Sequence, residues 1–109
     1  MTRVEILYFA GCPAYRRAKQ NAVAAMRAAG LAGEPAMRLV RNLRDAKDLD
    51  FHGSPTVRVD GRDIDPPGAQ NSPEVGLYSR SFKWGRKTFD APPPEMVSAA
   101  LARRGPPPP

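Results

Sequence analysis

Thirteen of the 109 residues are proline and nine are glycine, and these residue types restrict where regular helices and strands can run. Proline has no backbone N–H to donate, and glycine loses the most conformational freedom in an ordered element. Both should therefore lie largely in loops and at chain ends. The length suits one domain. We expect a single domain over residues 1–104 and a disordered, proline-rich tail over 105–109.

Hydrophobic patterning predicts an alternation of strands and helices. Residues 3–9 are apolar on both faces, which is typical of a strand covered on two sides. Apolar side chains at three- and four-residue steps predict a helix over 13–29 that ends at Gly30. Further strands are expected at 36–43, 56–59 and 62–64, and in the first of them Met37, Leu39 and Val40 should be buried. Asp60-Gly61 should form the hairpin turn between the last two strands. A short helix is expected at 44–49 and a last helix at 94–103. This order predicts an α/β fold, a mixed β-sheet with helices on both faces.

Two segments lack a clear pattern. Residues 65–73 are expected to form a polar loop. Residues 77–89 carry four aromatic side chains among basic ones and fit a loose hairpin that turns near 83–86. These aromatic side chains either line a groove for a partner or form a small separate core.

The charge and the cysteine count exclude several function classes. One cysteine and one histidine rule out an intrachain disulfide and make a cysteine- or histidine-rich metal site implausible, so we expect no metal and no cofactor. The net charge of +6 favours an acidic protein partner. The basic residues are scattered and no nucleic-acid motif accompanies them, so nucleic acid is an unlikely ligand. No signal peptide or membrane-length apolar run is present, so we expect a cytoplasmic protein with a reduced thiol and no membrane partner.

The first chemical motif is Gly11-Cys12-Pro13, between the first predicted strand and helix. A cysteine just before a helix lies near unpaired backbone N–H groups and the positive end of the helix dipole, which stabilise a thiolate. Arg16 would add positive charge if it pointed back toward the sulfur. The alternative interpretation is an inert cysteine buried as a small apolar group.

The second motif is Gly-Ser-Pro-Thr-Val at residues 53–57. A proline after a small residue at the start of a strand is a candidate for a cis peptide bond. Together, the two motifs resemble the thioredoxin superfamily, and most of all the small bacterial thioredoxin-like proteins with a Tyr-Phe-x-Gly-Cys-Pro start. The resemblance implies a thioredoxin-like three-layer fold. It also implies that Cys12 is the exposed attacking cysteine, that Pro55 is the cis-proline opposite it, and that Ser54 offers backbone hydrogen bonds to a bound thiol or peptide.

The chain departs from that family because Tyr15 stands where the second cysteine of Cys-x-x-Cys would be. A mixed disulfide at Cys12 would therefore persist until an external thiol resolved it. Four outcomes stay open: monothiol exchange with a low-molecular-weight or protein thiol, a Cys12–Cys12 homodimer, capture of a soft electrophile or metal, or a site that is no longer used.

The sequence thus supports two functional hypotheses. In the first, the protein is a monothiol oxidoreductase with Cys12 as its nucleophile, and Gly11, Pro13, Tyr15, Ser54 and Pro55 surround the substrate. His52 would be an auxiliary proton shuttle and Arg16 an auxiliary charge. In the second, the protein is a non-catalytic thioredoxin-fold binding module that uses its basic surface and the aromatic segment 77–89.

Overall fold

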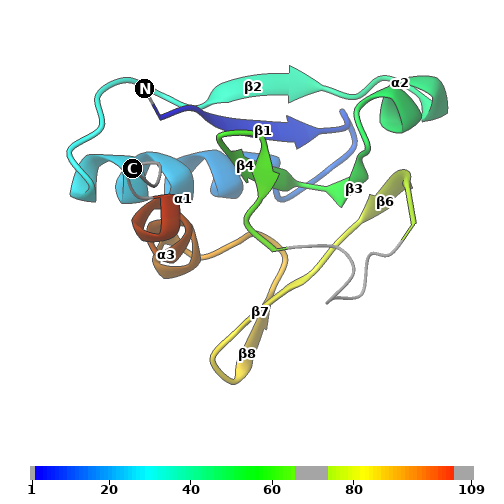
Figure 1. Ribbon diagram of the computed structural model, residues 1–109. Helices are drawn as coiled ribbons and strands as arrows, with labels where there is room; N and C mark the ends of the chain where they lie inside the picture. The colour runs from blue at the N-terminus through cyan, green and yellow to red at the C-terminus, as the bar shows by residue number, and fades with distance from the viewer. Residues whose placement is uncertain (1, 66–73, 105–109) are drawn as a thin grey trace.

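The computed structural model describes residues 2–65 and 74–104, and within them the chain forms a mixed α/β structure (Figure 1). The expected loop at 66–73 and the proline-rich tail at 105–109 lie outside the described residues. None of the helices in the described ranges is both long and apolar enough to cross a membrane.

The main sheet has four strands in the order β2-β1-β4-β5. Strand β1 (Val4–Tyr8) lies at its centre, parallel to β2 (Ala36–Leu39) and antiparallel to β4 (Thr56–Val59). Strand β5 (Arg62–Asp63) returns beside β4 through the Asp60-Gly61 turn. Both turn residues have positive φ, 52° and 82°, as a tight two-residue hairpin turn requires. The predicted mixed sheet and its hairpin are therefore confirmed.

The helices lie on opposite faces of this sheet. The long helix α1 (Tyr15–Ala28) and the last helix α3 (Pro94–Arg104) pack together on one face, in a core with Ile6 and Val57. The short helix α2 (Leu43–Asp48) packs its Ala46 on the other face, in a smaller core with Leu7, Val40 and Phe51. Figure 1 shows α1 and α3 on one side of β1 and α2 on the other.

The largest differences from the predicted element boundaries are at the start of α1 and the end of β2. Helix α1 begins at Tyr15 rather than at Pro13, because no side chain caps its first turn and Cys12-Pro13-Ala14 form a turn before it. Strand β2 ends at Leu39, and the Asn42 side chain accepts a hydrogen bond from the Asp45 N–H at 2.8 Å, which caps α2. Leu39, expected to be buried, is 44% exposed.

Two strands, β3 (His52–Ser54) and β6 (Gly76–Ser79), were not predicted. Strand β3 lies in the segment expected to be a loop, and it pairs in parallel with β6. Strands β7 (Phe82–Trp84) and β8 (Lys87–Phe89) form an antiparallel hairpin. This agrees with the loose hairpin expected near 83–86. The hairpin extends away from the sheet and helices (Figure 1).

Candidate functional site

The Cys12 thiol is buried, which corrects the expectation of an exposed attacking cysteine. The residue is 3% exposed and belongs to the main core, together with Ala18, Phe82 and Ala91. Its own N–H donates to the Phe9 carbonyl at 3.0 Å, so the backbone turns back before the helix. Since α1 starts only at Tyr15, Cys12 is not at the helix entrance that the thiolate argument required.

The end of the first strand nevertheless contacts the second sequence motif. The Ser54–Pro55 peptide bond is cis, the form that the sequence analysis anticipated. The Ser54 hydroxyl accepts a long hydrogen bond of 3.4 Å from the Phe9 N–H, which joins the stretch before Cys12 to the proline bend. However, the Ser54 carbonyl already accepts from the Arg80 N–H at 3.0 Å. One of the Ser54 backbone groups that the family resemblance assigned to a substrate, the carbonyl, thus already accepts a hydrogen bond from the chain itself.

The other residues expected around the sulfur do not form one site with it. Gly11 and Pro13 are exposed. Tyr15 stacks on Tyr8, with ring centroids 4.4 Å apart and planes 12° from parallel. The exposed Arg16 lies over the Tyr15 ring, with its guanidinium carbon 5.7 Å from the centroid. Its Nε donates to the Tyr15 hydroxyl, and this hydrogen bond raises the pKa of Arg16.

His52 lies in a separate small cavity of about 250 Å³, lined also by Asp50, Arg58, Gly61 and Asp63. Its Nε2 is 3.0 Å from an Asp50 carboxylate oxygen. Neither Cys12 nor any residue of α1 lines this cavity, so the structure offers no support for His52 as a proton shuttle to the thiol.

A buried arginine network was missed by the sequence analysis. The side chain of Arg80 has no solvent exposure. It donates to the Asp63 carboxylate at 2.8 Å, to the Thr56 hydroxyl at 3.1 Å and to the Asp65 carbonyl at 2.7 Å. The available signal was the two-residue alternation Tyr78, Arg80, Phe82, which places the arginine on the inward face of an extended segment.

Gly53 allows this segment to dock beside the proline bend. Its φ is +93°, and a Cβ there would lie 2.9 Å from the Tyr78 ring and 3.0 Å from the Arg80 Cβ. Any other residue would therefore separate β3 from β6.

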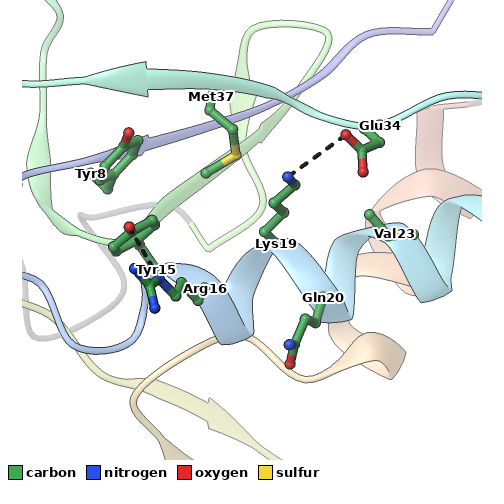
Figure 2. A pocket seen from close by; sticks show the side chains of 8 residues that line it. All are labelled: Tyr8, Tyr15, Arg16, Lys19, Gln20, Val23, Glu34 and Met37. Atoms are coloured by element: carbon green, nitrogen blue, oxygen red, sulfur yellow. Dashed lines mark hydrogen bonds and ion pairs between the residues drawn. The ribbon is translucent and has the colours of Figure 1, made fainter.

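An open groove of about 690 Å³ lies between the sheet and α1. Figure 2 shows Tyr8 and Met37 above it and residues of α1 below it, with an ion pair between Lys19 and Glu34 across one end. The groove is lined by Tyr8, Tyr15, Arg16, Lys19, Gln20, Val23, Glu34 and Met37.

The tip of the β7–β8 hairpin exposes an aromatic side chain among cations. Trp84 is 38% exposed and is the register partner of Lys87. Lys83, Arg86 and Lys87 are exposed, and none of them forms an ion pair with another residue in the described ranges. Phe82, at the base of the hairpin, is fully buried in the main core.

Over residues 2–65 and 74–104, no group of three or more histidine, cysteine, aspartate or glutamate side chains could hold a metal ion. No protein-family model, no curated protein and no solved structure matches the chain.

Proposed function

We propose that the chain is a thioredoxin-like protein that acts as a binding module for an acidic protein partner. The strand order β2-β1-β4-β5, with one parallel and two antiparallel pairs, supports the thioredoxin-like part of the proposal. The packing of α1 with α3 on one face and α2 on the other supports it as well. A cis-proline next to the stretch that carries Cys12 adds a third argument.

The observation that carries the binding role is the β7–β8 hairpin. Trp84 is exposed beside its cross-strand partner Lys87, and Arg86 lies in the turn next to them. This tip suits a partner that offers both an apolar contact and carboxylates, since tryptophan and arginine are enriched among the residues that dominate binding energy. The buried Phe82 holds the base of the hairpin, so its tip is presented on an anchored support. The burial of Cys12 favours this role over catalysis.

Binding of a fluorescein-labelled peptide of glutamate and tyrosine, followed by anisotropy, tests this role. We expect Trp84→Ala to weaken binding by about tenfold or more, as for a central contact residue. Lys87→Glu, at the cross-strand partner of Trp84, should also weaken binding, and binding should fall as salt is raised. Arg27→Glu is the matched control, because it makes the same charge change at the far end of α1. Equal effects of Lys87→Glu and Arg27→Glu would show that only the net charge attracts the peptide and would refute the hairpin site. Tighter binding of a DNA duplex than of the peptide would contradict the acidic-protein assignment.

Thiol–disulfide exchange at Cys12 is the second candidate function, favoured by the hydrogen bond that joins the Phe9 N–H to Ser54 beside the cis-proline. The Cys12 thiolate would attack the small-thiol sulfur of a mixed disulfide between that thiol and a protein cysteine, take over the small thiol as its own mixed disulfide and release the protein thiolate. A second small thiol would then attack the mixed disulfide at Cys12, restore the Cys12 thiolate and leave as the small disulfide. A Cys12–Cys12 dimer would require the same access to the sulfur.

Intact mass spectrometry after incubation with oxidised glutathione separates the two candidates, with Cys12→Ser as the control for non-specific adducts. We expect the native protein to keep its unmodified mass for hours, because the sulfur is buried. Formation of one adduct within minutes, reversed by reduced glutathione and absent from Cys12→Ser, would instead establish the monothiol function.

A further inference from the structure

Strand β2 forms an edge of the main sheet. It pairs with β1 alone in the part of the chain that the structure describes. The Val40 N–H donates to the Tyr8 carbonyl at 2.7 Å. Since successive N–H groups of a strand point to opposite sides, the N–H groups of Met37 and Leu39 point away from β1. An exposed strand edge of this kind is a template for another extended chain.

The groove of Figure 2 lies directly beside this edge. Met37 is the register partner of Ile6, whose side chain packs in the core against α1, so Met37 also faces that helix. A strand added along β2 would extend the sheet over the groove. Alternate side chains of the added strand would then lie above Tyr15 and Val23, which line the groove from α1.

Charge determines which occupant fits. Arg16 and Lys19 line the groove with the single carboxylate of Glu34, which pairs with Lys19 at 3.7 Å, so the lining carries one positive charge in excess. Arg38, on β2 itself, is exposed and lies 4.0 Å from the Glu5 carboxylate, and the whole chain carries a net charge of +6. A second copy of the chain would bring these cations together, whereas an acidic segment would neutralise them.

We propose that the β2 edge binds an extended acidic segment of a partner protein, which adds a strand to the sheet. Backbone hydrogen bonds to Met37 and Leu39 supply the general affinity. Alternate apolar side chains fill the groove between β2 and α1, and the intervening carboxylates lie near Arg16 and Lys19. This surface is separate from the β7–β8 hairpin, so neither assignment depends on the other.

The probe is a fluorescein-labelled nine-residue peptide that alternates glutamate with valine, followed by anisotropy. Leu39→Pro removes only an outward N–H, and proline is tolerated at such edge positions. Leu39→Ala is the matched control, because it truncates the same side chain and keeps the N–H. We expect Leu39→Pro to bind about tenfold more weakly than Leu39→Ala, the effect of losing one backbone hydrogen bond. Arg16→Glu combined with Lys19→Glu should weaken binding similarly, and Trp84→Ala should not affect it.

A measurement on the unaltered protein keeps the test decisive if Leu39→Pro fails to fold. Saturating peptide should slow amide hydrogen exchange at Met37 and Leu39 and leave the β7–β8 hairpin unchanged. No saturable binding, equal affinities of the proline and alanine variants, or equal binding of a lysine–valine peptide would overturn the proposal. A protein dimer that Leu39→Pro abolishes would also overturn it and assign the edge to a second copy.

Discussion

Arg80 places a formal charge where its side chain has no solvent exposure. Two carboxylates compensate it, Asp63 at 2.8 Å and Asp65 at 4.0 Å. The Thr56 hydroxyl and the Asp65 carbonyl accept further hydrogen bonds, and the centroid of the Phe82 ring lies 4.8 Å from the guanidinium carbon. Its backbone N–H donates to Ser54 as well. Because a buried charge is costly unless it is paired and hydrogen-bonded, this residue fixes the position of β6 against β3.

The Arg80–Asp63 pair yields a stability prediction. Asp63→Asn preserves the shape of the side chain but removes the nearer counter-charge of the buried arginine and leaves only the Asp65 carboxylate at 4.0 Å, which should cost about 3 kcal/mol of unfolding free energy. Arg80→Met removes the charge while retaining apolar bulk. The double variant should therefore be more stable than the sum of the two single losses, with a coupling of about 1–3 kcal/mol. Urea unfolding of the four proteins measures this coupling. Strict additivity would contradict the account.

Elements specified by local chemistry were predictable from the sequence. The β4–β5 hairpin follows from Asp60-Gly61, since aspartate and glycine accept the positive φ of a tight turn. The alternating and three-to-four-residue apolar patterns identified β1 and α1, because burial imposes these periods directly. The start of α1 was misplaced, because proline at 13 suits a first helical position and the sequence offers no capping side chain to locate the true one.

Elements that depend on distant partners were not predictable. Strand β3 exists because β6, some two dozen residues later, lies against Gly53. No local pattern shows a three-residue strand of this kind. The candidate site likewise has features that the sequence predicted and features that depend on distant residues. The family resemblance anticipated the cis bond before Pro55, and the Phe9 N–H, three residues before Cys12, donates to the Ser54 hydroxyl. The burial of the thiol depends instead on a core to which Phe82 and Ala91 contribute from much later in the chain.

At the scale of the whole molecule, the main sheet separates two cores of unequal size. The larger core holds Cys12 together with α1, α3 and Phe82, and the smaller one holds Ala46 of α2 with Phe51. The hydrogen bond from Arg80 to Asp63 holds the segment that leads to Phe82 against the main sheet. The Asn42 cap stabilises only α2, on the opposite face. Local unfolding on the α1 and α3 face should therefore expose the Cys12 thiol, whereas local unfolding of α2 should leave it buried.

Alkylation of Cys12 by iodoacetamide, followed by intact mass, tests this division of the molecule. Arg80→Met should accelerate alkylation more than its loss of global stability accounts for, because it loosens the segment that brings Phe82 into the core of Cys12. Asn42→Ala is the control on the opposite face. It removes a helix cap worth about 1 kcal/mol and should change the alkylation rate only through global unfolding. If both rates instead follow the global unfolding free energy alone, the thiol is reached only when the whole domain unfolds. In that case the segment from β6 to Phe82 does not control access to Cys12, and the folded protein cannot carry out monothiol exchange.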